Sequence, residues 1–570
     1  MALRRRTARF AGLVAAGLLL AACAPGGEPD TSSSSSSSSA TVLEPTGWRA
    51  ADRAQVADGG TLTLPVDALP AVYHTSSPNT QGDDLLIATL YVPAFVRLTA
   101  DGAWQPDPDY VASLEVTSSN PQVVELKINP DAVWSDGTPI TYRDVAATWH
   151  ALSGADESYP VIPNPVWADV SSVERGADDR DVVLTFSSPD AEWAGALTAV
   201  YPQWLMDTPQ HAESAWQAGP MASDGTSYVS GGPFVVTGVD TAGQVLTFGR
   251  NPRWWGDAPK LDTIVFRAVS RTTQGQSFAN GEIDAVDVHG DADVLVSAEQ
   301  RSDAVVQRAL STVLRMITLN GLSGPFADEA VRKAFAVAID RETLAEAVVG
   351  AVGAPTQLSG SLVFVPGQKG YVDHLGSTLT ANADDARAIL TGDGWTIGDD
   401  GVATKDGAPL TVRFIVPSET PVSSNVAELV RQQTAPAGFD VQVVTVPWED
   451  YFTSYISTQT RDFDATYFAS LGSAFPLASV ESSFDPANPD NNLGGVSDAS
   501  LTDLFARAGA ELDLDARIAL ANQIDEKVTA LHTTIPLFIE PWTWGVRADL
   551  ANYGPTQFEA PRWQDVGFTD

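Results

Sequence analysis

Alternating apolar and polar residues predict β-strands at several places in the first 190 residues of the chain. Apolar side chains recur at every second position within residues 59–66, 123–128 and 181–186. Successive side chains of a strand point to opposite faces of a sheet, so a period of two places one apolar row against a core. We therefore expect folded sequence to begin near residue 59, with a strand.

A second spacing, of three and four residues, predicts a helix over residues 141–152, and a polar pair marks its start. Thr141 is followed three residues later by Asp144, which is the spacing of a capping box. In that box each side chain accepts a hydrogen bond from a backbone N–H group that the first turn leaves without a partner. The expected buried face consists of Val145, Thr148, Trp149 and Leu152.

Further helices are predicted in the second half of the chain. Asp328 and Asp340 each precede an apolar-periodic segment and are expected N-caps, and Gly350 is the expected end of the second helix. Residues 500–531 predict two more helices, with a break near residues 512–515. Strand and helix patterns alternate along the chain, so the expected class is α/β with mixed sheets.

The N-terminus carries the pattern of a signal peptide. Four arginines lie within residues 4–9, and thirteen mostly apolar residues follow at positions 10–22, too few to span a bilayer. Leu20-Ala21-Ala22-Cys23 resembles the lipobox of bacterial lipoproteins. That resemblance implies removal of residues 1–22, lipidation of Cys23 and a Ser-rich tether over residues 23–57.

Length and charge narrow the class of partner. The chain has 570 residues, more than one hydrophobic core usually serves, so we expect two or three lobes. Its formal net charge of -39 repels phosphate backbones, which argues against a nucleic-acid partner. Cys23 is the only cysteine, so no disulfide framework is expected.

No catalytic constellation stands out. The chain lacks the HExxH, GxSxG and P-loop patterns, and the acidic stretch over residues 392–407 lacks the alternating ligands of a calcium loop. We expect that stretch to be a turn between a helix and a strand, and we expect no cofactor, no metal and no enzymatic activity. The histidines show no ligand spacing: His74, His150, His211, His289, His374 and His532.

Several longer blocks carry a family resemblance. They include SDGTP within residues 128–152, NPRWWGDAPKLDTIVFRAV over residues 251–269, and VRKAFAVAIDRETL within residues 319–344. Together they resemble the extracytoplasmic solute-binding proteins of ABC importers, in family 5, which binds oligopeptides, dipeptides and nickel. Turn residues, caps and packed aromatic residues account for these blocks, so we expect most of their residues to be scaffold.

The resemblance implies a periplasmic-binding-protein-like α/β fold of class II, cluster C, with two mixed-sheet lobes around a ligand cleft and an extra inserted lobe. Lobe I is expected at residues 58–96, 181–270 and 531–570. Lobe II is the insertion at residues 97–180, and lobe III covers residues 271–530. The ligand is expected between lobes I and III, which close over it by hinge motion.

The implied function is that of a monomeric receptor, lipid-anchored on the outer face of the cytoplasmic membrane. It would capture an oligopeptide or peptide-like solute and deliver it to a permease that works with separate ATPase subunits. Three alternatives stay open. They are a peptide-pheromone receptor, an importer receptor for a nickel chelate, haem or oligosaccharide, and a secreted hydrolase, which the missing nucleophile motif disfavours.

The resemblance also suggests ligand-contacting residues. Peptide-binding members carry an acid in the stretch that corresponds to residues 469–476, where it pairs with the α-amine, but this chain has none there. Either Asp485 or Asp490 supplies the charge, or the ligand has no free amine. The candidates are Ser77, Asn79, Thr80, Tyr467, Ser470, Leu471, Gly472, Ser473, Ala474, Phe475, Asp485, Asp490, Asn491 and Asn492.

Overall fold

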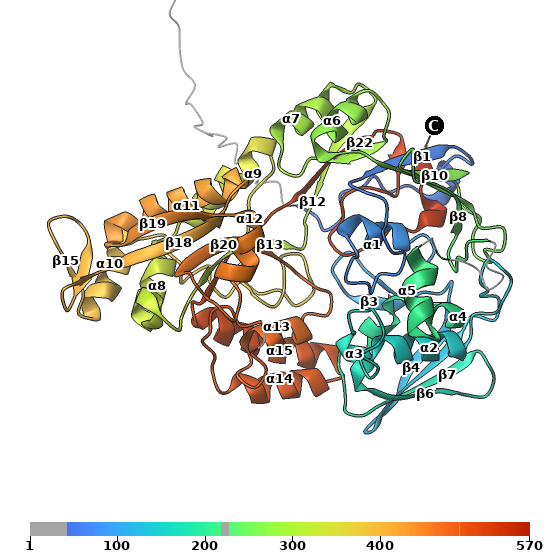
Figure 1. Ribbon diagram of the computed structural model, residues 1–570, viewed down its shortest axis with the longest axis horizontal. Helices are drawn as coiled ribbons and strands as arrows, with labels where there is room; N and C mark the ends of the chain where they lie inside the picture. The colour runs from blue at the N-terminus through green and yellow to red at the C-terminus, as the bar shows by residue number, and fades with distance from the viewer. Residues whose placement is uncertain (1–42, 218–219, 221–226, 490, 570) are drawn as a thin grey trace, which may run out of the picture. The chain divides into compact units, whose positions relative to one another are not determined.

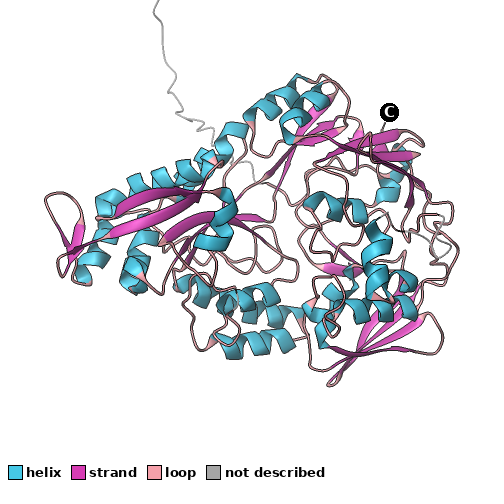
Figure 2. Cartoon of the chain, viewed as in Figure 1, coloured by secondary structure: helices cyan, strands magenta, loops and turns pink. Residues whose placement is uncertain are grey.

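The computed structural model describes residues 43–217, 220, 227–489 and 491–569 (Figure 1). The predicted signal peptide, Cys23 and the serine run lie outside the described residues, as does Asp490. Helices and strands alternate along the chain, and the strands form several separate sheets (Figure 2). The expected α/β class with mixed sheets is therefore confirmed.

Lobe I contains a four-stranded sheet in the order β1-β10-β9-β8. Strand β1 is parallel to β10, and the other neighbours are antiparallel. The strand predicted near residue 59 is confirmed as β1, and its alternating side chains Leu62, Leu64 and Val66 are all buried. Its strands are β1 (Thr61–Val66), β8 (Phe234–Asp240), β9 (Val245–Arg250) and β10 (Thr263–Ala268), with α1 (Gly82–Ala88) following β1.

Lobe II contains an antiparallel sheet in the order β4-β5-β7-β6. The predicted boundary at residue 180 is wrong by one strand, because β7 pairs with β5 and β6 of this sheet. The elements are β4 (Val111–Ser119), β5 (Gln122–Ile128), β6 (Val170–Arg175), β7 (Asp181–Phe186), α2 (Tyr142–Leu152) and α3 (Pro165–Asp169). The hairpin β2 (Val96–Leu98) and β3 (Trp104–Pro106) precedes them, and η2 (Trp193–Thr198), α4 (Gln203–Met206) and α5 (Pro209–Gln217) follow.

Helix α2 starts as its sequence predicts. The Thr141 hydroxyl accepts a hydrogen bond from the Arg143 N–H at 3.3 Å, and Asp144 accepts from the Thr141 N–H at 2.7 Å. Val145 and Leu152 are buried, so the apolar face lies where the spacing places it. The capping box and the buried face together account for this helix.

Lobe III is built on a six-stranded sheet in the order β14-β21-β13-β20-β18-β19. The strands are β13 (Val313–Leu319), β14 (Gln357–Leu358), β18 (Thr411–Pro417), β19 (Asp440–Val446), β20 (Ala465–Leu471) and β21 (Thr534–Ile539). One face packs against α8 (Glu329–Ala338), α9 (Arg341–Val349), α10 (Ala383–Gly392) and α11 (Pro421–Thr434). The small elements nearby are η3 (Gly324–Ala327), η4 (Gly350–Val352) and η5 (Ala435–Ala437).

The predicted helix starts in lobe III are correct. The side chain of Asp328 accepts from the Ala330 N–H at 2.9 Å, and that of Asp340 accepts from two N–H groups of α9 at 3.1 Å. The acidic stretch over residues 392–407 forms turns around β15 (Thr396–Ile397) and β16 (Ala403–Lys405), followed by β17 (Ala408–Pro409). Lys405 forms an ion pair with Asp393 there, at 2.6 Å.

A second, helical layer of lobe III has its own core. It contains α13 (Leu477–Phe484), α14 (Leu501–Ala510) and α15 (Leu514–Ala530), and residues 363 and 364 belong to the same cluster. The break between α14 and α15 at residues 511–513 lies where the sequence places it. Beside this layer lies α12 (Trp448–Asp450), followed by the π-helical turn η6 (Tyr451–Tyr455), in which the Tyr451 hydroxyl shares a hydrogen bond with the Thr466 hydroxyl of the sheet.

A three-stranded sheet in the order β11-β22-β12 corrects the predicted limits of lobe III. Its strands are β11 (Ala285–Asp287), β12 (Ala304–Ala309) and β22 (Trp542–Arg547), with α6 (Arg271–Ala279) and α7 (Ala292–Gln300) beside them. Asp284 hydrogen-bonds to Thr63 of β1, so we group this sheet with lobe I. By strand pairing, lobe III spans residues 313–539 instead of 271–530.

The chain therefore crosses between lobes I and III at two places, residues 310–312 and 540–541. On one side of these crossing segments β12 pairs with β22, and on the other side β13 pairs with β21. The Ser311 hydroxyl donates to the Glu540 carbonyl at 2.5 Å, which ties the two crossings together. The same ribbon of two antiparallel strands thus runs through both lobes.

The predicted tether is wrong for residues 43–57, which belong to the folded part. Thr46 forms a β-bridge with Thr556, and Val56 forms one with Thr569. The Leu310 N–H donates to the Glu44 carbonyl at 2.9 Å, beside the first crossing segment. The remaining short elements are η1 (Arg53–Gln55), β23 (Leu550–Ala551), η7 (Trp563–Asp565) and β24 (Gly567–Phe568).

Candidate functional site

The carboxyl ends of three neighbouring strands meet at one edge of the lobe III sheet. Strands β18, β19 and β20 are parallel to one another, so they all end at this edge. The start of β13 also lies here, because Val313 pairs with Leu471 at the end of β20. The edge thus adjoins the crossing segments. Ligands of open α/β sheets bind outside the carboxyl ends of the strands, and the predicted loop over residues 471–476 leaves from there.

A cavity of about 270 Å³ lies over the face of the sheet that carries Phe468 and Ser470. We call it the sheet cavity. Met316 and Thr318 of β13 line it from below, and residues 362–365 line it from another segment. Of the predicted residues it brings together Ser470, Leu471, Gly472, Ser473, Asn491 and Asn492.

A second cavity, of about 210 Å³, lies where lobe III meets the β2–β3 hairpin and the start of η2. We call it the interface cavity. Residues 102–104 and 191–193 line one side, and residues 474–477 and 512–521 contribute to the other. Ala474 and Phe475 of the predicted set line it, and Phe364 and Pro476 line both cavities, so the two adjoin.

Aromatic side chains form much of the wall of the interface cavity. Trp104 and Trp193 meet edge to face, with ring centroids 5.0 Å apart. On the lobe III side, the ring of Phe475 faces Gly195, where an added Cβ would lie 3.4 Å from it. Phe475 therefore contacts the opposite side of the interface, as a cleft residue would.

Tyr467 lies away from both cavities. It is 1% exposed, and its ring belongs to the core between the sheet and helices α8–α11. Neighbouring side chains on a strand point to opposite faces, so Phe468 enters the sheet cavity instead. The Arg315 guanidinium lies 5.8 Å from the Tyr467 ring and forms an ion pair with Glu540. Burial raises the pKa of Tyr467.

Ser77, Asn79 and Thr80 line neither cavity. The Ser77 hydroxyl accepts from the Asn79 N–H at 3.1 Å, and the Thr80 hydroxyl donates to the His74 carbonyl at 3.2 Å. These bonds close a turn after the first strand. Thr75, beside them, lines a separate cavity of about 340 Å³ that also includes Trp254 and Trp563.

Asp485 and Asn492 hold their own loop together. The Asp485 carboxylate accepts from the Thr502 hydroxyl at 2.5 Å and from the Ala487 N–H at 3.0 Å. The Asn492 amide oxygen accepts from the Gly495 N–H at 2.7 Å, and its nitrogen donates to Ser497. Asp485 lines neither cavity, and its carboxylate is engaged within its own loop.

Glu192 is an acid in the interface cavity that the sequence does not single out. Its Oε1 accepts from the Leu477 N–H at 3.0 Å, across the interface and 285 residues away along the chain. Glu192 is 8% exposed, and burial raises its pKa to about 7. The positive charge of Arg517, which also lines the cavity, lowers the pKa of Glu192. The Arg517 guanidinium donates its hydrogen bond to the Ala191 carbonyl, at 2.5 Å, and not to the Glu192 carboxylate. With 72 acids in the chain, no local signal could mark this one.

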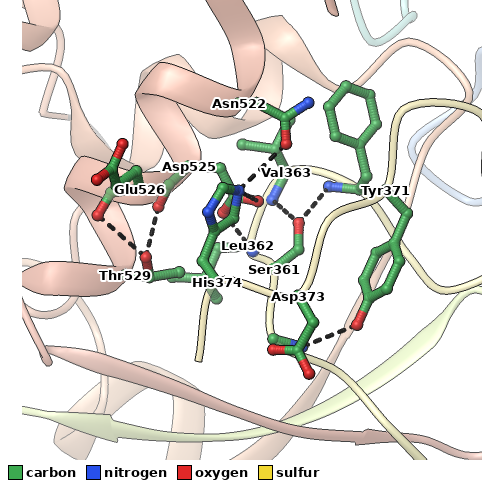
Figure 3. A network of polar contacts seen from close by, with 12 residues as sticks. Ser361, Leu362, Val363, Tyr371, Asp373, His374, Asn522, Asp525, Glu526 and Thr529 are labelled. Carbon is green, nitrogen blue, oxygen red and sulfur yellow. Dashed lines mark hydrogen bonds and ion pairs between the residues drawn. The ribbon is translucent and has the colours of Figure 1, made fainter. Parts of the chain in front are cut away.

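A polar network holds the segment that lines both cavities (Figure 3). We call residues 359–376 the cavity loop. The Leu362 N–H donates to Asp525 of α15 at 2.8 Å, and the Ser361 hydroxyl accepts from the Phe364 N–H at 2.8 Å. His374 contacts the same helix, with its Nε2 3.5 Å from Asp525 Oδ2. Burial raises the pKa of Asp525 to about 6.

Neither metal-site geometry nor a spanning helix is found in the part of the chain that the structure describes. Within residues 43–217, 220, 227–489 and 491–569, no three or more His, Cys, Asp or Glu side chains are grouped to hold a metal ion. Over the same ranges, no helix is both long and apolar enough to cross a membrane.

Comparison with known proteins finds relatives in sequence and in structure. The Mycobacterium bovis protein "Oligopeptide-binding protein OppA" is 34% identical over 525 residues, covering 91% of this chain and 86% of that protein. The structure titled "Periplasmic EDTA-binding protein EppA" matches 93% of this chain and 99% of its own, with a TM-score of 0.80 at 24% identity. The oligopeptide-binding protein AppA from Bacillus subtilis, in complex with a nonapeptide, matches 90% and 100%, with a TM-score of 0.69 at 18% identity.

The fold of these structures is that of the family which the motif blocks resemble. The sequence profile "Bacterial extracellular solute-binding proteins, family 5 Middle" matches residues 105–492. That match spans the sheet of lobe II, most of the residues that line the two cavities and most of lobe III. With its match to more than half of the chain and a relative at 34% identity, this protein belongs to family 5 of the bacterial extracellular solute-binding proteins.

Proposed function

We propose that this protein is the receptor of an ABC importer and that it captures oligopeptides or peptide-like solutes between its lobes. The observation that carries this proposal is the interface cavity, whose walls come from both sides of the two chain crossings. A ligand that touches both sides stabilises their contact, so binding and closure are the same event. No bond needs to be made or broken.

The relatives support a peptide as the ligand. The mycobacterial relative is named as an oligopeptide-binding protein, and the Bacillus subtilis structure holds a nonapeptide. The two adjoining cavities suit an extended ligand, because neither reaches the volume of roughly 300–1,000 Å³ that small-molecule sites usually have. The candidate contacts are Ser470, Leu471, Gly472, Ser473, Ala474 and Phe475 from lobe III.

Native mass spectrometry of protein purified without refolding tests the ligand class. We expect a distribution of masses that fragment into amino-acid series. A single non-peptide mass, such as a metal chelate, would redirect the ligand assignment while leaving the receptor role. Incubation with labelled peptides should return them intact, and release of fragments would instead support a hydrolase.

The membrane and permease partners form the second part of the proposal. A lipid on Cys23 would hold the receptor at the outer face of the cytoplasmic membrane, near a permease with separate ATPase subunits. Cys23→Ala should abolish labelling with a palmitate analogue and release the protein or leave a longer precursor. Loss of peptide uptake in a deletion strain would support transport, whereas intact uptake with loss of a peptide response would support a signalling receptor.

A further inference from the structure

The interface cavity contains a buried acid, Glu192, and its lining also includes the cations Arg517 and Lys369. Among the residues that line it, Glu192 is the one acid. Within the described residues, no Lys, Arg or His side chain forms an ion pair with Glu192. Burial raises the pKa of Glu192, while the hydrogen bond from the Leu477 N–H and the charge of Arg517 act against this rise. A buried carboxylate without a cation is costly, and a bound cation would remove that cost.

The position of the Glu192 carboxylate is fixed before any ligand arrives. Its hydrogen bond from the Leu477 N–H, at the N-terminus of α13, joins two sides of the interface. Next to it, the Ala191 N–H donates to the Gly509 carbonyl at 2.6 Å. A preorganised carboxylate binds a cation without a further ordering cost, so it can contribute to specificity.

The other charged groups around Glu192 are accounted for. Arg517 of α15 is held by the Ala191 carbonyl, and Lys369 of the cavity loop is exposed. Asp190 lies next to Glu192 on its own segment, and Glu511 and Asp513 lie near Arg517. Of these groups, Arg517 and Lys369 line the cavity with Glu192, whereas Asp190, Glu511 and Asp513 do not. Trp104 and Trp193 add aromatic faces, which attract an ammonium group.

We propose that Glu192 is the specificity-determining residue that pairs with the positively charged end of the ligand in the interface cavity. Given the proposed function, on which this inference rests, that end is the α-ammonium group of a peptide. The interface cavity, of about 210 Å³, would hold one end of such a ligand, and the rest of the peptide would extend into the adjoining sheet cavity of about 270 Å³. The missing acid of residues 471–476 is thus replaced from the opposite side of the interface.

The substitution Glu192→Gln separates charge from shape. The Gln amide oxygen can still accept from the Leu477 N–H, so the contact between the two sides stays while the charge is lost. Glu481→Gln is the matched control, because Glu481 is also a partly buried acid, lies in the middle of α13 and lines neither cavity. Both variants should unfold within a few degrees of the parent protein.

The probe is a random pentapeptide mixture in two forms, with a free and with an acetylated N-terminus, offered in competition at pH 7.5. Native mass spectrometry reads the ratio of bound forms. We expect a preference of at least about tenfold for the free amine, since a hydrogen bond to a charged group contributes more than one between neutral groups. Glu192→Gln should bring the ratio to about one, and Glu481→Gln should keep the parent's preference.

Each outcome decides a separate question. If the parent protein binds neither form, the proposed peptide function fails, and this inference fails with it. If it binds both forms equally, the peptide function stands and the role of Glu192 is wrong. A free-amine preference that survives Glu192→Gln also overturns that role. Tighter binding to the Gln variant would show that Arg517 and Lys369 receive an anionic group there.

Discussion

Asp525 places a carboxylate in an apolar layer, where it anchors the cavity loop. It accepts the Leu362 N–H, is fully buried, and lies 3.5 Å from His374. Its pKa of about 6 lies above the usual value of about 3.9 for an Asp side chain. The folded protein therefore binds this proton more tightly than the unfolded chain does. The stability that protonation contributes is present at low pH and is lost as the pH rises from about 4 through 6.

Asp525→Asn should therefore raise the melting temperature at pH 7.5 and raise it less at pH 4.5. The Asn amide oxygen can keep the hydrogen bond from Leu362, while the buried charge is removed. Thermal unfolding followed by circular dichroism at both pH values measures the difference. The control is Glu526→Gln, which removes an exposed charge one residue away on α15. An increase that does not depend on pH would contradict this assignment.

At the scale of single residues, the sequence points to cavity-lining positions where the relevant contact is local, and their contact with a ligand stays a prediction. The loop over residues 470–475 follows directly from the end of a strand, and its members do line the two cavities. Tyr467 was expected among them, but the alternation of the strand sends its neighbour Phe468 into the cavity instead. Glu192 could not be found in this way, because its partner Leu477 lies 285 residues away.

Helix α9 illustrates the scale of single elements, where side-chain caps fix the start. Asp340 accepts from the N–H groups of Glu342 and Thr343, and the hydroxyl of Thr343 donates back to it at 2.6 Å. Two of the donors that the first turn leaves free are thereby satisfied. The helix carries Leu344 and Ala345 into the core of lobe III, so its start matters to that core.

Asp340→Ala should lower the free energy of unfolding by about 1 kcal/mol, the usual contribution of an N-cap. Asp340→Asn should recover most of this loss, because its amide oxygen can accept the same bonds. Urea unfolding measures both variants, and unchanged m-values would show that the effect is on stability alone. Equal losses in the two variants would mean that the charge, not the cap, is the stabilising feature.

Most helix starts and strands followed from local pattern, whereas the sheet memberships did not. Strand β21 was expected in lobe I and instead pairs with β13 and β14 in lobe III. Similarly, β7 joins lobe II, and β11 and β12 form a sheet with β22. Strand pairing depends on which apolar faces meet in space. The alternation of apolar and polar residues has a period of two in every strand, so it does not tell which strands become neighbours.

For the whole molecule, closure over a ligand should protect the elements that touch across the interface. Residues 189–193 and helices α13–α15 exchange hydrogen bonds there, for example between Ala191 and Gly509. Hydrogen exchange followed by mass spectrometry should slow in both segments when peptide is added. Helices α8 and α10, packed on the far face of the sheet, serve as the internal control and should be unaffected. Uniform protection across lobe III would contradict a change confined to the interface.

Residues 44 and 45, near the start of the described part of the chain, lie beside the first crossing segment, and this has a mechanical consequence. The Leu310 N–H donates to the Glu44 carbonyl, and the Gln557 N–H donates to the Pro45 carbonyl. A body that turns about an axis sweeps its far edge through a wide arc while points on the axis stay in place. A chain that enters beside the axis is therefore not pulled when the lobes swing, whatever holds its other end. Under the proposal of a lipid on Cys23, opening and closing would cost no work against that anchor.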